Sequence, residues 1–430
     1  MGENGDIVGR SVKEAAALIR QYFAEMTQAR EEGRPTCYVY VMGSFASLLR
    51  SFGILPVFSE VVALNTAVRK VAHEYIGIAE DYGYSADVCG YVKADVGLYF
   101  KDGDHPMGRI PRPSMAVITN ACNTYIKWAE IWERFYGVPI MVVEIPDPSY
   151  PGEPHGGGPE DEALYRRYVM DQVWELIHLC EKVSGRKFDE ESLREHLQYE
   201  NEMKRHYRRL MELNKHCPAP FDALSHGTAF LGIMNALRGT KEGAEFFRRA
   251  VEEMEYKVAH GIGALPEEKF RLFLTGVPCY PIWRRFGEMF NEKGGNFVYS
   301  TYMAFASGGG DVDYDFDLER PVESMAEGVM REVRFGLSRL LAQPQCLSKM
   351  AEDYQVDGVV FHAIKSCRTV TTGLAESRLV MTHELPQVVT LYLDSDHMDR
   401  RVVAEAQMKN RIDAFFEAMA VRKLAKAQER

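Results

Sequence analysis

Three of the eight cysteines stand where an apolar segment or a polar turn gives way to a new segment. They are Cys89 in SADVCGYVKADVG, Cys122 in MAVITNAC and Cys367 in GVVFHAIKSCR. An isolated cysteine at the end of a buried strand is most often a small core hydrophobe. Thiolates are also the ligands that iron prefers, and a cluster held by three of them keeps one iron position open for substrate or hydroxide. Residue type alone leaves both interpretations open.

The spacing of the cysteines excludes local metal motifs. No CxxC pair occurs in the chain, whereas zinc fingers and ferredoxin-type clusters use closely spaced ligands. A metal site would therefore have to be assembled from distant cysteines by the fold. Lys365 and Arg368 stand beside Cys367, and we expect their positive charges to lower the pKa of its thiol.

Other candidate nucleophiles have simpler interpretations. Ser44 follows a glycine at the end of an apolar run, where the local pattern favours a helix cap. His362 lies inside an apolar run, and alternation points it toward the core as a hydrogen-bonded structural histidine. The sequence has no GxSxG elbow, no GxxxxGK[ST] loop and no dinucleotide fingerprint. Neither ATP nor NAD therefore has a recognisable site in this chain.

The elements that must position these residues alternate between short apolar runs and amphipathic helical segments. Strand, helix, strand at these intervals predicts parallel sheets, and we expect an α/β fold with two Rossmann-like domains and an intervening helical region. Eight runs rich in β-branched and aromatic residues are the expected strands: 35–44, 53–60, 115–122, 138–146, 270–281, 296–305, 356–364 and 387–395.

Changes in composition suggest where the domains meet. A Pro- and Gly-rich segment at 146–162 separates an N-terminal α/β domain, residues 1–150, from charged amphipathic helices at 151–265. A C-terminal α/β domain is expected over 266–430. Ligands of open parallel sheets bind at the carboxyl ends of the strands, which is where Ser44, Cys122 and Cys367 stand.

Composition restricts the class of protein. The chain has 430 residues, 46% of them hydrophobic, and a formal net charge of -11. That charge provides no basic surface for a phosphate backbone, so we expect no nucleic-acid partner. The N-terminus becomes an amphipathic helix without an apolar signal core, and no membrane-length apolar run follows. We expect a cytoplasmic protein that does not enter a membrane.

Four motifs in order resemble one known family. SADVCGYVKADVG, ITNACNTYIKW, VDGVVFHAIKSCR and the D-x-D-x-x-D-x-R stretch at 394–401 are similar to the 2-hydroxyacyl-CoA dehydratase family, which includes ATP-dependent benzoyl-CoA reductases. The amino-acid sequence of these motifs is most similar to that of the larger cluster-binding subunit of the reductase branch. The resemblance covers nearly the whole chain, and the ordered set is much more specific than any one motif.

The resemblance implies a set of site residues. Members of the family hold one [4Fe-4S] cluster per subunit with three cysteines, and the matching positions are Cys89, Cys122 and Cys367. In the dehydratases a serine and a glutamate lie near the open iron, and Ser44 and Glu60 stand at the corresponding places. The alternative for this pair is a helix cap and a surface charge at the end of a strand. The other five cysteines match no ligand position.

The resemblance also implies a reaction and partners. VMGSFASLL and Asn123, which follows Cys122 where dehydratases often have aspartate, depart from the dehydratase pattern and favour the reductases. The implied reaction is single-electron reduction of an aromatic acyl-CoA thioester. Implied partners are a homologous second cluster-bearing subunit, ATP-hydrolysing iron–sulfur activator subunits and the acyl-CoA substrate. Alternatives are a dehydratase subunit that forms enoyl-CoA, a low-potential reductase with a double-cubane cluster, and a subunit that only relays electrons.

Overall fold

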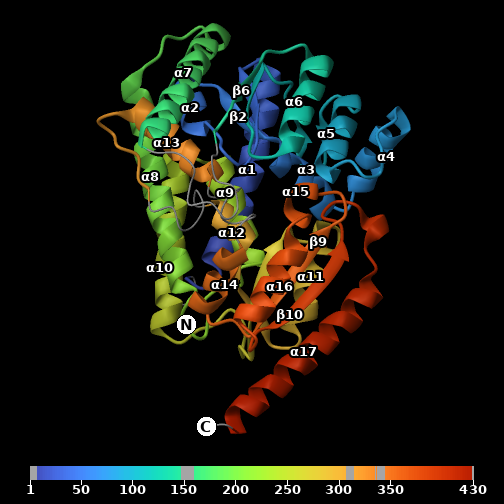
Figure 1. Ribbon diagram of the computed structural model, residues 1–430. Coiled ribbons are helices and arrows are strands. Elements are labelled where there is room, and N and C mark those ends of the chain that lie inside the picture. Colours follow the sequence, from blue (N-terminus) through green and yellow to red (C-terminus); the bar gives the residue numbers. More distant parts are fainter. Residues whose placement is uncertain (1–6, 147–158, 307–313, 335, 337–343, 429–430) are drawn as a thin grey trace.

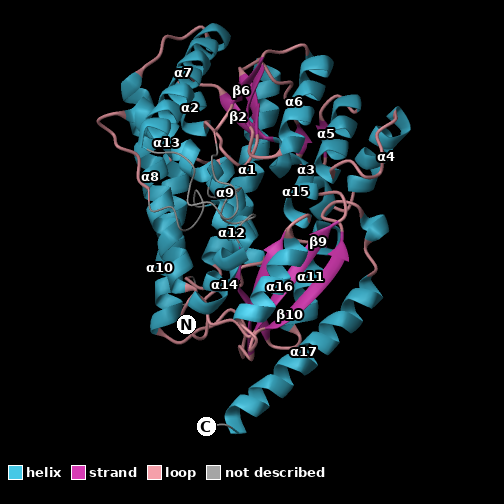
Figure 2. Ribbon diagram, in the orientation of Figure 1, coloured by secondary structure: helices cyan, strands magenta, loops and turns pink. Residues whose placement is uncertain are grey.

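A computed structural model describes residues 7–146, 159–306, 314–334, 336 and 344–428, and it contains two separate parallel sheets (Figures 1 and 2). The N-terminal sheet has the strand order β2-β1-β5-β6. Its strands are β1 (Thr36–Val39), β2 (Leu55–Phe58), β5 (Met115–Thr119) and β6 (Ile140–Val143), and all neighbours are parallel.

The C-terminal sheet has the order β10-β9-β7-β8 and is also parallel throughout. Its strands are β7 (Phe270–Gly276), β8 (Gly295–Ser300), β9 (Gly358–Ile364) and β10 (Val389–Ser395). The predicted α/β fold and all eight predicted strands are confirmed, with shorter bounds than the apolar runs. A small antiparallel hairpin, β3 (Asp104–His105) with β4 (Gly108–Arg109), was not expected.

Helices in the N-terminal part connect and cover its sheet. They are α1 (Arg10–Glu32), α2 (Ala46–Ser51), α3 (Ser59–Val68), α4 (Ala72–Tyr82), α5 (Gly90–Phe100) and α6 (Asn123–Tyr136). Apolar residues of α6 recur at helical spacing and bury Trp128 and Trp132 against β5 and the aromatic core. Helix α1 packs against β2, α9 and α10, so it joins the N-terminal sheet to the helical layer.

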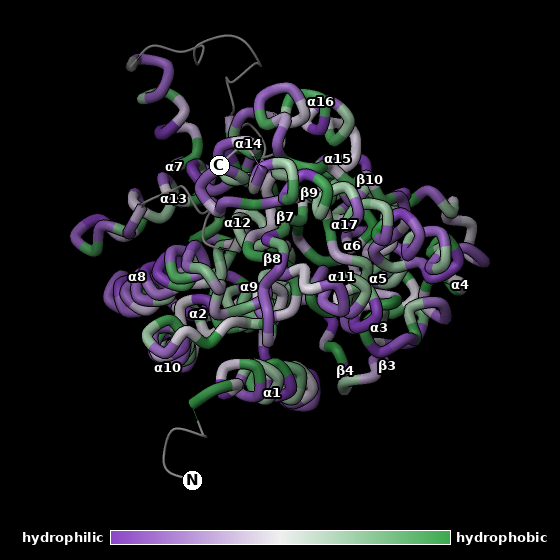
Figure 3. The backbone as a smooth tube through the Cα atoms, turned by 90° about the horizontal axis from the view of Figure 1, so that it is seen from below, coloured by the Kyte–Doolittle hydropathy of each residue, from purple (hydrophilic) through white to green (hydrophobic). Residues whose placement is uncertain are grey.

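Four helices form a layer along one side of both sheets (Figure 1). The layer consists of α7 (Pro159–Ser184), α8 (Glu190–Leu213), α9 (Ser225–Ala236) and α10 (Lys241–Ala259), and α7, α8 and α10 among them are long. Helices α8 and α10 pack side by side at the rim of the molecule (Figures 1 and 3). Helix α13 (Pro321–Arg334) joins this layer from the C-terminal part by packing on α7 and α8.

The remaining helices surround the C-terminal sheet. They are α11 (Trp283–Asn291), α12 (Thr301–Ala306), α14 (Pro344–Asp353), α15 (Arg368–Thr371), α16 (Leu374–Glu384), α17 (Glu405–Gln428) and the short 3-10 helices η2 (Tyr280–Ile282) and η4 (Arg400–Val402). The buried His362 bonds Val277 O through Nδ1 at 2.6 Å and Ser395 Oγ through Nε2 at 2.6 Å, which confirms its structural role.

Two hydrophobic cores follow the sheets, one around each. The first extends from the N-terminal sheet into α7 and α13, and the second extends from the C-terminal sheet into α8, α9 and α10. The domain boundaries at 150 and 265 stay a prediction, and most of the Pro- and Gly-rich segment, residues 147–158, lies outside the described residues. None of the helices in the described residues has the length and apolar character needed to cross a membrane.

Candidate functional site

The carboxyl ends of the two sheets open onto one shared cavity of about 110 Å³. Residues following all four strands of the C-terminal sheet and three strands of the N-terminal sheet line it. From the N-terminal sheet these residues are Val41 after β1, Glu60 after β2 and Cys122 after β5. From the C-terminal sheet they are Val277 after β7, Tyr302 after β8, Cys367 after β9 and His397 after β10. Cys89 also lines it, so the three cysteines singled out in the sequence meet in this space, here named the thiol cavity.

Each of these three cysteines occupies the N-cap position of a helix. Cys89 precedes α5, Cys122 precedes α6 and Cys367 precedes α15. The first N–H groups of a helix have no partner within it, and their partial positive charge favours a thiolate. Backbone N–H groups of Tyr91 and Val92 act on the Cys89 sulfur in this way. The arrangement is therefore suited to sulfur anions.

Burial opposes that effect on the thiols. It raises the pKa of Cys89 well above its ordinary value and that of Cys367 to about 11, and the charges of neighbouring cysteines raise both further. That Lys365 and Arg368 lower the pKa of Cys367 stays a prediction, because both side chains are exposed and burial has the largest effect on the pKa of this thiol. The groups that lower it are the N–H groups of Val370 and Thr369.

Polar contacts across the cavity join the two halves. Cys122 Sγ lies 3.1 Å from Thr369 Oγ1, and Thr369 donates to Asn123 Oδ1 at 3.4 Å. Asn123, the residue that departs from the dehydratase pattern, thus faces α15. The backbone N–H of Gly90 donates to Ser366 Oγ at 3.3 Å. All three cysteine loops are therefore connected between the N-terminal and C-terminal sheets.

The acidic motif at 394–401 fixes the Cys367 loop through hydrogen bonds to Ser366. Asp396 is buried and accepts hydrogen bonds from the Ser366 N–H and hydroxyl and from the N–H groups of Met398 and Asp399. Arg401 donates to Asp399 and to Glu80, which also pairs with the buried Lys93. The motif that marked the family thus positions the loop and fastens the halves together.

Glu60 lies in the first turn of α3, directly after β2, and not within the strand. Its side chain is 5% exposed, which excludes the alternative of a surface charge. The carboxylate accepts hydrogen bonds from the Tyr125 hydroxyl and, at 3.0 Å, from the N–H of Val41. Burial raises its pKa to about 7 against the opposing effect of these donors. A carboxyl with that pKa can hold or release a proton near neutral pH.

Two kinds of cavity residue escaped the sequence interpretation. His397 is buried with its ring 4.4 Å from that of Tyr91, edge to face, and its Nδ1 has no hydrogen-bond partner among the described residues. The Tyr91 hydroxyl lies 3.1 Å from that of Tyr302. His397 is the variable fourth position of D-x-D-x, so only its place after a strand could have indicated it.

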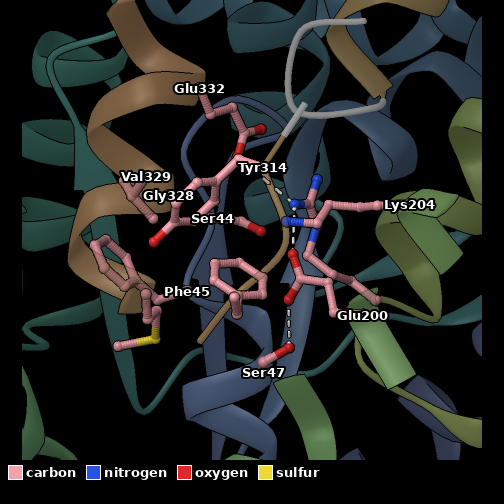
Figure 4. A pocket seen from close by; sticks show the side chains of 12 residues that line it. Ser44, Phe45, Ser47, Glu200, Lys204, Tyr314, Gly328, Val329 and Glu332 are labelled. Carbon is pink, nitrogen blue, oxygen red and sulfur yellow. Dashed lines mark hydrogen bonds and ion pairs between the residues drawn. The ribbon is translucent and has the colours of Figure 1, made fainter. Parts of the chain in front are cut away.

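Ser44 does not line the thiol cavity. It faces a separate small cavity between β1 and helices α8 and α13, shown in Figure 4. Helix α2 begins with Phe45 as its N-cap and no side-chain cap bond, so the helix-cap alternative for Ser44 is wrong. The structure therefore brings Glu60 to the cysteines and leaves Ser44 apart from them.

The cavity beside Ser44 contains a buried group of charges. Arg238 pairs with Glu200 at 3.1 Å and with Glu332 at 3.6 Å, and Lys204 lies over the Phe316 ring. Ser44 Oγ, Arg238 Nε and Glu332 Oε1 are buried without a hydrogen-bond partner in the described residues. The free volume is about 20 Å³, enough for one water molecule.

The donor set of the thiol cavity fits an iron–sulfur cluster. Three soft sulfur ligands, helix N-termini that favour thiolates and a largely apolar wall suit such a group.

The protein has two α/β sheets, each with parallel strands, and three cysteines at helix N-termini line one cavity between them. This architecture defines its structural class. A family model agrees with that architecture. The chain belongs to the family described as 2-hydroxyglutaryl-CoA dehydratase, D-component, which matches residues 46–419. The predicted family is thereby confirmed.

Characterised relatives fall into two reaction classes. The chain is 29% identical over 415 residues to a benzoyl-CoA reductase subunit of Thauera aromatica, covering 93% of this chain and 92% of that protein. It is 27% identical over 414 residues to the (R)-2-hydroxyisocaproyl-CoA dehydratase alpha subunit of Clostridioides difficile, covering 94% and 95%. The alpha subunit of (R)-2-hydroxyglutaryl-CoA dehydratase from Acidaminococcus fermentans is 23% identical over 96% of this chain and 97% of its own.

Proposed function

We propose that this chain is the cluster-binding subunit of a benzoyl-CoA reductase-like complex that reduces an aromatic acyl-CoA thioester by single electrons. Cys89, Cys122 and Cys367 would hold a [4Fe-4S] cluster in the thiol cavity. The observation that carries the proposal is the meeting of these three thiols, each at a helix N-terminus, between two sheets. When bound, the cluster supplies low-potential single-electron transfer.

The residues of the chain prepare the cavity for that chemistry. Val277, Leu231 and Trp128 give it apolar walls that exclude water, which strengthens any charge interaction inside. Glu60, with its pKa near 7, would hold or move a proton at its carboxyl oxygens beside the reacting group. The Tyr125 hydroxyl and the Val41 N–H fix the orientation of that carboxyl.

The proposal requires partners. The relatives are named as subunits, and this sequence has no GxxxxGK[ST] loop. A homologous second cluster-bearing subunit and ATP-hydrolysing iron–sulfur activator subunits would supply the electrons. ATP hydrolysis by this chain alone would contradict that division of labour.

A 2-hydroxyacyl-CoA dehydratase subunit is the second candidate, because dehydratase subunits match this chain over as much of its length as the reductase subunit does. The stretch VMGSFASLL and Asn123, which faces Thr369 of α15, are the features whose departure from the dehydratase pattern favours the reductase. The test is to supply the anaerobic complex, with activator, ATP and reductant, with benzoyl-CoA and with (R)-2-hydroxyacyl-CoA esters. We expect consumption of the aromatic ester; formation of enoyl-CoA alone would establish the dehydratase.

A further inference from the structure

A buried carboxylate joins two of the three helices that begin at the cysteines. Asp95 lies in α5 and is 6% exposed, and its Oδ2 atom accepts hydrogen bonds from two indole N–H groups of α6. Trp128 Nε1 donates at 2.7 Å and Trp132 Nε1 at 2.6 Å. The reaction proposed above uses the carboxyl of Glu60 and gives Asp95 no part.

The contact lies at the same depth in both helices. Asp95 is six residues after Cys89, the N-cap of α5, and Trp128 is six residues after Cys122, the N-cap of α6. Six residues of α-helix span about 9 Å. A hydrogen bond between equivalent positions therefore restricts the shift of one helix past the other, and with it the separation of the two cysteines.

Asp95 also contributes a buried charge. Burial raises the pKa of its carboxyl to about 6 against the opposing effect of the two indoles, so the group is mostly ionised at pH 7. In the part of the chain that the structure describes, no cation pairs with it. An ionised carboxylate in the core costs stability that an apolar side chain of similar size would not.

The charge lies close behind the wall of the thiol cavity. Trp128 lines the cavity and bonds Asp95 through its indole nitrogen. Burial raises the pKa of Tyr40 well above its ordinary value, and the charges of four groups raise it further: Glu60, Asp95, Cys122 and Cys89. The field of Asp95 and the fields of two cysteines thus reach the same hydroxyl.

A fixed negative charge disfavours the arrival of an electron nearby, most strongly where little water screens it. The reduction potential of an iron–sulfur cluster depends on the charges and hydrogen bonds around it. Two consequences therefore meet at Asp95, one for the placement of the cysteines and one for the potential of a cluster bound to them.

We propose that Asp95 is a positioning residue that braces the helices of Cys89 and Cys122 through the two indoles, and that its charge keeps the potential of the bound cluster low. This inference rests on the proposed function for the nature of the cluster. It adds a residue outside the thiol cavity that controls the geometry and the electrostatics of the cluster site.

The test separates the hydrogen bonds of Asp95 from its charge. Asp95→Asn removes the charge and keeps a carbonyl oxygen that can accept both indoles, whereas Asp95→Leu removes both. The matched control is Asp81→Asn, the same substitution at an exposed position of α4. Each anaerobically purified complex is titrated for reduction potential by EPR, on the signal that Cys367→Ser abolishes, and its iron release to a chelator is timed.

Two further measurements need no cluster. The ultraviolet Raman band that reports indole N–H hydrogen bonding and the thermal midpoint are recorded on iron-free protein. Two of the four tryptophans of the chain donate to Asp95, so loss of these bonds changes a large part of the band.

We expect Asp95→Asn to keep the indole band and the parent rate of iron release, while its cluster is reduced at a less negative potential. Asp95→Leu should lose the bonded indole band and release iron about tenfold faster, because the support of two ligands is lost. The control should match the parent in every measurement.

A parent-like potential in Asp95→Asn would overturn the proposal, as would a parent-like indole band or rate of iron release in Asp95→Leu. If Asp95→Leu does not fold, the potential of Asp95→Asn still decides. Failure of the proposed function is distinguishable, because it appears as absent iron in the parent, whereas the indole band of the iron-free proteins reports the brace by itself.

Discussion

Ser366 donates two hydrogen bonds to one oxygen of Asp396, from its hydroxyl at 2.6 Å and from its backbone N–H at 3.0 Å. The same hydroxyl accepts the N–H of Gly90, the residue after Cys89. One buried carboxylate therefore fixes the loop of Cys367 and, through a single serine, the loop of Cys89. The distance between two cysteines from opposite halves depends on this contact.

Replacement of Asp396 should test that dependence. Asp396→Ala leaves four hydrogen-bond donors without their acceptor, at a cost of roughly 3 kcal/mol or more in the free energy of unfolding. We expect a lower thermal midpoint and less bound iron. Asp394→Ala, an exposed residue of the same motif, is the control and should retain both. Full iron in Asp396→Ala would show that the loop needs no such support.

The strands and the convergence of two cysteines followed from the sequence, whereas other features did not. Apolar, β-branched runs between amphipathic helices defined all eight strands, and the rule for strand ends indicated Cys122 and Cys367. Cys89 follows α4 and caps α5, so no strand indicated it; its place after a polar turn made it a candidate, and the family resemblance made the assignment specific.

The position of Ser44 shows why other features of the site could not be predicted from the local sequence. Its surroundings are made by Glu200 and Lys204 of α8 and Glu332 of α13, which the chain brings back from far along the sequence. Glu60 differs, because the turn from β2 into α3 alone directs it toward the cavity. The pKa of its carboxyl, however, depends on burial by both halves, which local pattern does not report.

Glu60 should govern both turnover and the pH dependence of stability. Its pKa is raised from 4.5 to about 7 in the folded protein, so the folded state binds the proton more tightly than the unfolded state. Stability from this group is therefore complete below about pH 4.5 and is lost as pH rises to about 7, by up to about 3 kcal/mol. Glu60→Gln should show a smaller fall in thermal midpoint between pH 5 and pH 8.

The same variant should lose most turnover while it keeps its iron and its affinity for coenzyme A, since only the titrating proton is removed. Glu323→Gln, at an exposed position of α13, provides the control. Unchanged turnover and an unchanged pH profile in Glu60→Gln would restrict Glu60 to packing.

Substitutions in the charged cavity beside Ser44 should affect the stability of the protein more than its turnover. Glu332→Leu leaves the buried Arg238 with one carboxylate partner instead of two, which costs roughly 3 kcal/mol. Ser44→Ala removes only one hydroxyl from the cavity and should lower turnover less than Glu60→Gln does, because Ser44 does not line the thiol cavity. Thermal melts and turnover of both variants, measured on the same complex, check this order. A larger turnover loss in Ser44→Ala would place its hydroxyl in the reaction.

Iron and acid-labile sulfide per chain, measured on the anaerobically purified protein and its cysteine variants, test the central claim most directly. We expect about four iron atoms per chain, as one [4Fe-4S] cluster requires. Cys89→Ser, Cys122→Ser and Cys367→Ser should each lose most of the iron, whereas Cys217→Ser and Cys346→Ser, which change cysteines outside the thiol cavity, should retain it. Full iron and unchanged absorbance in Cys367→Ser, together with loss of iron in Cys346→Ser, would contradict the account.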